Sequence, residues 1–274
     1  MYSRVYVEIT NICNMNCSFC HGHSRKARRM TEEEYARVLQ QLKGKTQYIY
    51  HHLMGEPLTH PLLPRFIQMA SQAGFHPMIT TNGTLLDRCG DKLLVPGLHK
   101  VNISLHSFEG DRQEDHDEYI RKIADFAEKA ADRGIKISLR LWNKGFDEGR
   151  NDRALEVLHR KFPDPWTENT RGYRIREGLF MEWGDRFAWP DQNAPDHGEC
   201  LTCRGLRDHF GILSDGTVVP CCLDSDGIIN LGNVFEEELA DILAAPRAMA
   251  IPEGFRRRKA VEDLCRRCGY AQKF

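Results

Sequence analysis

Patterns typical of strands and helices alternate along this chain of 274 residues, up to about residue 165. Two of the predicted strands, 100–106 and 135–142, have one apolar face and one polar face. A parallel strand that helices cover on both sides is apolar throughout, so here only one side is expected to meet helices. The alternation therefore predicts an α/β fold in which parallel strands line an open, partly solvated barrel. An antiparallel sheet with one wet face is the alternative, and the helical segments between the strands argue against it.

Helix signals separate the predicted strands. Thr31 and Glu34 form a capping box ahead of an apolar stripe. A second helical pattern over 117–133 ends at Gly134, which is a typical stop residue. The predicted strands cover residues 5–10, 47–53, 76–81, 100–106, 135–142 and 173–178.

Three cysteines follow the first predicted strand at C-x3-C-x2-C spacing: Cys13, Cys17 and Cys20. A 4Fe–4S cluster is normally held by four cysteines, so three thiolates leave one iron open to another ligand. A small zinc site is the alternative. Zinc requires four ligands, and His21 or His23 would have to supply the fourth.

The segment that ends at Cys20 reads VEITNICNMNCSFC. It closely resembles the signature of the radical S-adenosylmethionine (SAM) enzymes, in which the amino acid end of SAM chelates the open iron. The resemblance implies a partial (β/α)6 TIM-like barrel with its chemistry at the carboxyl ends of the strands. It also implies that Cys13, Cys17 and Cys20 ligate the first 4Fe–4S cluster, and that Phe19 belongs to the cofactor site.

The motif Gly55-Glu56-Pro57 follows the second predicted strand. In the radical SAM family a GGE-like or GEP motif at this place meets the amino group of SAM. An ammonium requires acceptors, which turn carbonyls and a carboxylate provide, and glycine permits close backbone approach. Taken alone, the motif is also compatible with a plain turn before the next helix.

Three further residues match the family pattern. Asn82, in Thr81-Asn82-Gly83, follows the third strand, and Ser104 and Arg140 lie on the fourth and fifth strands. In the family, such strand positions often contact the ribose or carboxylate of SAM. The alternative for Ser104 and Arg140 is hydrogen-bonded polarity lining the barrel.

Six more cysteines lie in the last 75 residues. Four of them resemble the shortened SPASM module called twitch, which holds one auxiliary 4Fe–4S cluster: Cys203, Cys221, Cys265 and Cys268. Their intervals look like those of 2-deoxy-scyllo-inosamine dehydrogenase. The chain ends six residues after Cys268, so we expect a single auxiliary cluster. Cys200 is an alternative to Cys203, and a zinc site of the pairs Cys200–Cys203 and Cys265–Cys268 is the competing assignment.

The expected organisation is a radical SAM core over 1–186, a linker over 187–198 and an auxiliary cluster module over 199–274. In the module, residues 210–222 are predicted to form a hairpin turned at residues 215–216, followed by a short helix.

Composition restricts the setting. No apolar stretch approaches the roughly 18 residues of a membrane span, and no signal peptide is present, so we expect a cytoplasmic protein without a membrane partner. The ten cysteines are then metal ligands or free thiols. A net charge of −1 argues against nucleic acid as a partner. The basic runs 25–29 and 256–259 are compatible with one alternative from a different class of protein, a metal-stabilised module that contacts RNA.

The resemblance implies that SAM is cleaved reductively and that a 5′-deoxyadenosyl radical removes a hydrogen atom from the substrate. An external one-electron reductant, similar to flavodoxin or ferredoxin, is then required. The substrate is a small molecule or a peptide, and a polar pocket is predicted from Trp142, Asn143, Arg150, Arg174, Arg176 and Glu182.

We expect dehydrogenation, with the auxiliary cluster as electron acceptor. Two alternatives remain. An epimerase would use Cys222 as hydrogen donor, because neighbouring side chains in a strand point to opposite faces and Cys222 would then face away from the cluster. A packing thiol is the simpler role for Cys222. A peptide-modifying enzyme usually carries a leader-peptide domain, for which the 12 residues before Cys13 leave no room.

Overall fold

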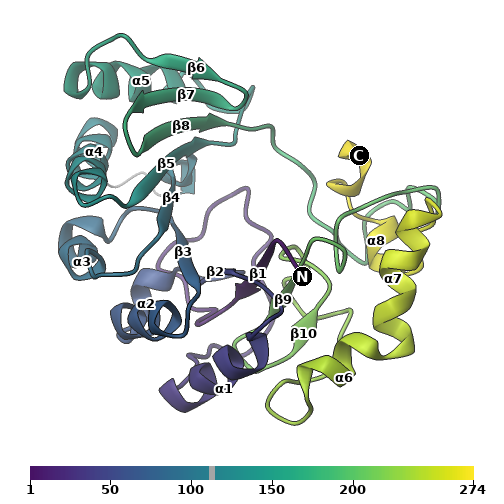
Figure 1. Cartoon of the computed structure of the whole chain (residues 1–274). Coiled ribbons are helices and arrows are strands. Elements are labelled where there is room, and N and C mark those ends of the chain that lie inside the picture. Colours follow the sequence, from purple (N-terminus) through teal and green to yellow (C-terminus); the bar gives the residue numbers. More distant parts are fainter. Residues whose placement is uncertain (111–114) are drawn as a thin grey trace.

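Seven neighbouring parallel strands form the centre of the computed structural model, which describes residues 1–110 and 115–274 (Figure 1). The whole sheet has the order β10-β9-β1-β2-β3-β4-β5-β8-β7-β6. Its strands are β1 Arg4–Val7, β2 Tyr48–Tyr50, β3 His76–Thr81, β4 Lys100–Ser104, β5 Lys136–Leu141, β6 Thr167–Asn169, β7 Gly172–Arg176, β8 Leu179–Trp183, β9 His209–Ile212 and β10 Val218–Val219. The parallel βα units predicted from the sequence are confirmed.

Helices cover the outer side of the curved sheet, as Figure 1 shows for α2, α3 and α4. The helices are α1 Glu32–Leu42, α2 Leu63–Gln72, α3 Leu86–Leu93, α4 His116–Asp132, α5 Arg150–Lys161, α6 Leu239–Ala244, α7 Pro246–Arg256 and α8 Asp263–Arg266. The capping box of Thr31 and Glu34 is present at the start of α1. None of the helices in the described part of the chain is both long enough and apolar enough to cross a membrane.

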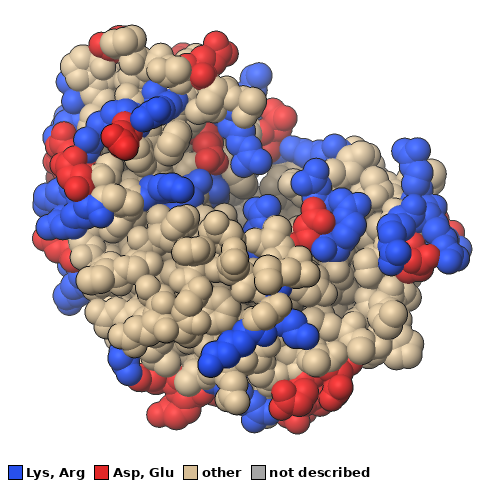
Figure 2. Space-filling model, in the orientation of Figure 1, with Lys and Arg blue, Asp and Glu red and all other residues tan. Residues whose placement is uncertain are grey.

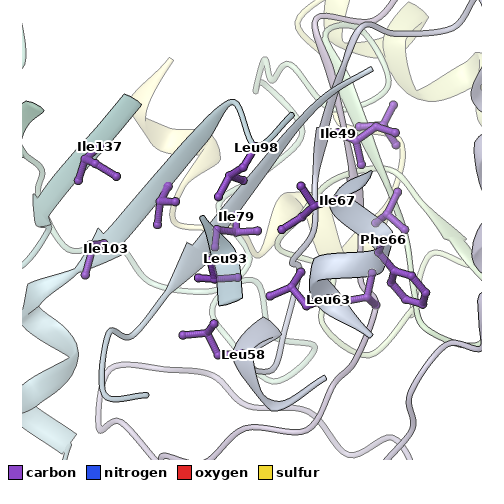
Figure 3. Close-up of a cluster of buried hydrophobic side chains, with 14 of the residues drawn as sticks. Ile49, Leu58, Leu63, Phe66, Ile67, Ile79, Leu93, Leu98, Ile103 and Ile137 are labelled. Carbon is purple, nitrogen blue, oxygen red and sulfur yellow. The ribbon is translucent and has the colours of Figure 1, made fainter. Parts of the chain in front are cut away.

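The hydrophobic core lies between the sheet and these helices. The apolar face of each central strand is fully buried there, for example at Ile79, Ile103 and Ile137. Figure 3 shows these side chains together with Leu63 and Ile67 of α2. Burial of apolar surface stabilises this layer by about 25 cal/mol per Å². The opposite, inner face of the strands is polar, as the alternation in the sequence predicts.

The inner face curves far enough to bring distant strands together. Arg140 of β5 is close enough to Tyr6 of β1 and Tyr50 of β2 for their charges to interact, although β3 and β4 lie between these strands in the sheet. Such contacts across the interior require a curved, barrel-like sheet. The architecture therefore agrees with the expected partial TIM-like barrel.

The strand predicted over 173–178 has a different role from the other predicted strands. It is present as β7, but it pairs antiparallel with β8, which takes the sixth place among the barrel strands next to β5. Gly178, with φ of +75°, turns the chain between them. The reason for this order is burial, because Leu179 and Met181 of β8 are fully buried whereas β7 buries Ile175 alone.

The predicted hairpin near the C-terminus is confirmed, since β9 and β10 pair antiparallel. Its first strand also pairs in parallel with β1, so the hairpin continues the barrel sheet. The short helix predicted after the hairpin is α6. The divisions at residues 187 and 199 stay predictions, and the shared sheet places part of the C-terminal module in the barrel wall.

Candidate active site

Three loops meet at the carboxyl ends of β1, β2 and β3. The cysteine loop, residues 13–20, is joined to the second loop because the Glu56 backbone N–H donates to the Ile12 carbonyl over 2.9 Å. It is joined to the third loop because the Asn82 amide donates to the Asn14 side-chain oxygen over 3.0 Å. The structure therefore brings together the three motifs that the sequence places far apart.

Gly55 is required by the close approach of these loops. Its φ is +74°, and a Cβ at this position would lie 2.5 Å from the Thr10 carbonyl oxygen. Real Cβ atoms do not approach so closely, and a positive φ is also costly for residues other than glycine. Pro57, two residues on, begins a short 3-10 helix that carries the chain away from the loop.

The Glu56 carboxylate lies inside this junction and is only 2% exposed. It accepts hydrogen bonds from the backbone N–H groups of Leu58 at 3.0 Å and Asn82 at 2.7 Å. Burial nevertheless raises the pKa of Glu56 to about 7. A carboxylate offers about four lone-pair directions, so acceptor capacity remains for an ammonium group. Glu56 thus both joins two loops and suits the role that the sequence predicts for it.

The thiols of Cys13, Cys17 and Cys20 lie within electrostatic range of one another. Desolvation, followed by the neighbouring Cys13 and Cys20, raises the pKa of Cys17 to about 12. A bound cationic metal group reverses this tendency, because it stabilises thiolates. Three convergent thiols suit a cluster with an open iron.

The ring of Phe19 lies against His106 and Arg186, at 4.9 Å and 5.8 Å between centres. Its carbonyl accepts a hydrogen bond from the Trp189 indole over 3.1 Å. The predicted linker therefore runs across the cysteine loop and holds Phe19 in place.

Arg140 and Ser104 are paired in register on the inner face of the barrel. The Arg140 guanidinium forms an ion pair with Glu182 at 3.4 Å and lies 4.6 Å from the Trp142 ring. Lys100 contacts the same carboxylate at 3.3 Å. Burial opposes ionisation of Glu182, but the two cations outweigh it and lower its pKa.

Other predicted pocket residues lie elsewhere. Arg176 forms an ion pair with Asp132 at 2.8 Å, and Arg150 forms one with Glu148 at 2.7 Å. Arg174 is exposed on the antiparallel strand β7, and the Asn143 amide oxygen accepts a hydrogen bond from Asn151. Of the predicted set, Trp142 and Glu182 are the two that lie next to Arg140.

Sequence reasoning missed four aromatic or basic residues on the inner face: Tyr6, Tyr50, His52 and Lys100. Tyr6 and Tyr50 lie 5.2 Å apart, and His52 lies at their edges. Desolvation lowers the pKa of His52 to about 3, so its ring is neutral. The period-2 alternation of the first, second and fourth predicted strands was the available signal, because each of these residues occupies a polar-face position.

The C-terminal cysteines form a second group. The thiol of Cys221 is close to those of Cys265 and Cys203, and Cys203 is also close to Cys268. Burial raises the pKa of Cys221 and of Cys265. Cys200 is exposed. Four mutually close thiols suit the auxiliary cluster predicted for them.

The structure offers no site for a single metal ion within residues 1–110 and 115–274. No three His, Cys, Asp or Glu side chains there lie close enough together to hold one. A cluster of four irons is larger than one ion and therefore requires wider ligand spacing.

Cys222 is close to Cys221 and to Cys203. Its side chain also lies close to Tyr6 on the inner face. Desolvation dominates and raises the pKa of Cys222 to about 11, so the thiol keeps its proton at neutral pH. Leu53, Met54 and Val219 surround this corner of the barrel.

Comparison with known families agrees with this site. Residues 7–144 match the radical SAM superfamily, and residues 203–269 match the iron–sulfur cluster-binding domain SPASM. The chain belongs to the radical SAM superfamily. It is an enzyme of that superfamily with a C-terminal SPASM-type module. Its cofactors are SAM, the 4Fe–4S cluster that binds it and an auxiliary 4Fe–4S cluster.

Curated relatives include several GTP 3′,8-cyclases. The probable cyclase of Archaeoglobus fulgidus is 29% identical over 279 residues, which cover 85% of this chain and 90% of the relative. That of Methanocella arvoryzae is 25% identical, with 88% of each chain covered. The cyclase of Chlorobaculum tepidum is 31% identical over 112 residues, and the match spans only 34% of its length.

Two solved structures share the fold. BtrN in complex with AdoMet and 2-DOIA superposes with a TM-score of 0.62 at 18% identity, covering 98% of this chain and 93% of BtrN. SuiB of Streptococcus suis bound to S-adenosylmethionine gives 0.63 at 16% identity, covering 92% of this chain and 68% of SuiB. The expected architecture of barrel and C-terminal module is thereby confirmed.

Proposed function

We propose that this enzyme dehydrogenates a polar, anionic substrate held on the inner face of the barrel. The bound cofactors supply two elements, a hydrogen-abstracting radical derived from SAM and an electron acceptor at the auxiliary cluster. Loss of a hydrogen atom, a proton and an electron then leaves the product lighter by two hydrogens. Cys13, Cys17 and Cys20 hold the first cluster, and Cys203, Cys221, Cys265 and Cys268 hold the second.

One observation supports dehydrogenation above the alternatives. Cys221 lies among the auxiliary thiols, and the next residue, Cys222, contacts Tyr6 on the inner face. The auxiliary ligands are therefore one residue away from the space in which the substrate is proposed to bind. An electron left on the substrate has a short path to the acceptor. The superposition with BtrN covers nearly all of both chains, which also favours the same assignment of one cluster to SAM and one to electron acceptance.

The charges of the inner face support an anionic substrate. Lys100 and Arg140 share the single carboxylate of Glu182. Arg4 stacks over Tyr50 at 6.0 Å, and within the described residues it forms no ion pair. Positive charge in excess attracts and orients anionic groups, more strongly where water is partly excluded. Figure 2 shows Lys and Arg side chains bordering a hollow near the centre of the view.

Unpaired polar atoms on the same face support a ligand there. The Asn102 side-chain oxygen and His52 Nδ1 are buried and have no hydrogen-bond partner. Buried polar groups are nearly always paired, by protein, water or ligand. Glu182, kept ionised by its two cations, is the group proposed to accept the substrate proton.

Epimerisation is the second candidate, because the Cys222 thiol is protonated and lies beside Tyr6. A hydrogen atom returned from this thiol would invert a carbon centre without changing the product mass.

Two other chemistries come from the names of similar proteins. GTP, the substrate in the name of the cyclases, is anionic and suits the positive inner face. Peptide modification is suggested by the structure of SuiB with its precursor peptide SuiA, which superposes with a TM-score of 0.54. In the first basic run considered for RNA, Arg25 pairs with Glu8 and Arg28 pairs with Glu34, so these two cations are engaged within the protein.

The test is anaerobic turnover in D2O, with reduced enzyme, SAM and a panel that contains an aminocyclitol, GTP and a peptide. Dehydrogenation yields a product lighter by two hydrogens and reduces the auxiliary cluster once per turnover. A product of unchanged connectivity that carries one deuterium shows epimerisation. A rearranged nucleotide or a crosslinked peptide would replace the proposal altogether.

A further inference from the structure

The Glu8 carboxylate, directly after β1, is fully buried and accepts five hydrogen bonds. Arg25 donates two of them in a forked arrangement, over 2.8 and 2.7 Å. Ser214 donates through its backbone N–H at 3.1 Å and its hydroxyl at 2.9 Å, and the Met54 N–H donates at 3.1 Å. A buried carboxylate is stable only when its lone pairs are satisfied in this way.

These donors come from three separate segments of the chain. Arg25 lies five residues after the cluster ligand Cys20. Met54 immediately precedes the Gly55-Glu56-Pro57 motif, and Ser214 lies in the hairpin of the C-terminal module. One carboxylate therefore joins three parts of the molecule. They are the arm of the first cluster loop (residues 21–25, directly after Cys20), the Gly55-Glu56-Pro57 motif and the auxiliary module.

Arg25 extends this junction to the auxiliary cysteines. Its Nε donates to the Ser225 carbonyl over 2.8 Å, and Ser225 lies four residues after Cys221. Next to it, the Ser24 backbone N–H and hydroxyl both donate to Asp226, over 2.6 and 3.0 Å. The arm that follows the first cluster is thus hydrogen-bonded to the turn that follows an auxiliary ligand.

The first cluster loop contributes little to its own stability. Cys13 and Cys20 are exposed, and residues 13–20 bury no large apolar side chain. A loop with few buried contacts depends on the elements that anchor its ends. The Glu8 junction is one of these anchors, beside the contacts of the loop with Glu56, Asn82 and Trp189, and it is the one shared with the hairpin of the auxiliary module.

We infer that Glu8 and Arg25 are positioning residues that couple the two cluster sites. When the auxiliary cluster binds, it fixes the turn over 221–226. The hydrogen bonds of the junction then restrict the motion of the arm of the first cluster loop. Because binding equilibria that share one element are linked reciprocally, each cluster then strengthens retention of the other. This coupling is independent of which reaction the enzyme catalyses.

The test is a double-mutant cycle on the reconstituted holoenzyme. Cys265→Ala removes the auxiliary cluster, and Glu8→Gln removes the charge at the junction. The readout is the chelator concentration that removes half of the first cluster, followed by the electron paramagnetic resonance signal that changes when SAM is added. In the parent, Cys265→Ala should lower this concentration by about 5- to 150-fold, the usual range of coupling between sites. In the Glu8→Gln background the same change should have little effect.

Matched variants keep the result interpretable. Glu32→Gln breaks the exposed Glu32–Arg65 pair, which touches neither cluster, and should leave the coupling intact. Arg25→Lys keeps the charge but loses the fork, so it should retain part of the coupling. If Glu8→Gln fails to fold, Ser214→Ala carries the test, because it removes the hydroxyl through which the hairpin of the C-terminal module reaches Glu8. Equal retention of the first cluster with and without the auxiliary cluster, or coupling undiminished in Glu8→Gln or, where that variant does not fold, in Ser214→Ala, overturns the inference.

Discussion

The Glu56 carboxylate accepts a hydrogen bond from the backbone N–H of Asn82 over 2.7 Å, and so joins the loops that follow β2 and β3. This bond gives Glu56 a second role beside the one expected toward the SAM amino group. A substitution at this position therefore acts on the cofactor directly and on the loop geometry around it.

Glu56→Ala should weaken SAM binding while leaving the iron content unchanged, because the side chain is proposed to contact the cofactor and not the metal. Loss of one charge-assisted hydrogen bond costs roughly 1.5–3 kcal/mol, or about 10- to 150-fold in affinity. Equilibrium binding of SAM to reconstituted enzyme measures the effect. An unchanged dissociation constant would show that the motif is only a turn.

SAM affinity should rise with pH through about 7, the raised pKa of Glu56. Below that pH the carboxyl group is protonated in the folded protein and loses its attraction for an ammonium. The same shift lowers the stability of the folded protein progressively as pH rises from the ordinary pKa of 4.5 to about 7, because there the unfolded chain binds fewer protons, and the full cost remains above pH 7. Binding titrations at pH 6 and pH 8 should differ in the parent, and Glu56→Gln should remove the difference.

Replacing Cys13, Cys17 and Cys20 together by Ala should leave about four irons of about eight, since only the auxiliary cluster remains. Formation of 5′-deoxyadenosine should be abolished. Iron analysis and product chromatography measure the two effects. SAM cleavage that survives in this variant contradicts the assignment of the first cluster.

Pyrophosphate, as a probe of the inner face, should bind the holoenzyme and change the fluorescence of Trp142, which lies 4.6 Å from Arg140. Lys100→Gln should weaken this binding by about 10- to 150-fold, because a charged donor is lost. Added salt should weaken it as well. Arg65→Gln, on the outer surface, is the control. Absence of saturable binding, or equal binding by Lys100→Gln, would exclude an anion site here.

Cys222→Ala should retain SAM cleavage and normal product formation if the enzyme is a dehydrogenase. If the thiol donates a hydrogen atom, the variant should instead cleave SAM and form no epimer. Turnover in D2O with mass spectrometry separates the two outcomes, because only the thiol exchanges with solvent deuterium before transfer.

Local patterns were sufficient for several elements of the fold. The capping box of Thr31 and Glu34 marks the start of α1, and the strand predicted over 76–81 matches β3. Alternation in the fourth and fifth strands predicted their polar inner face. The turn at Asp215-Gly216 predicted the hairpin. Each of these signals depends on residues within a few positions of one another, so the chain carries it locally.

The cysteine spacings and their resemblance to the radical SAM signature likewise indicated the cofactor class from the sequence, because ligands within one short loop constrain one another directly. The order of β7 and β8 was decided by tertiary structure, since it depends on which strand buries its side chains against β5. The ion pair of Arg140 with Glu182 and the contact of Cys222 with Tyr6 also join distant segments. So does the Glu8–Arg25 junction with Ser214. Such contacts arise only when the sheet curves and closes, because no local preference encodes which side chains then meet across it.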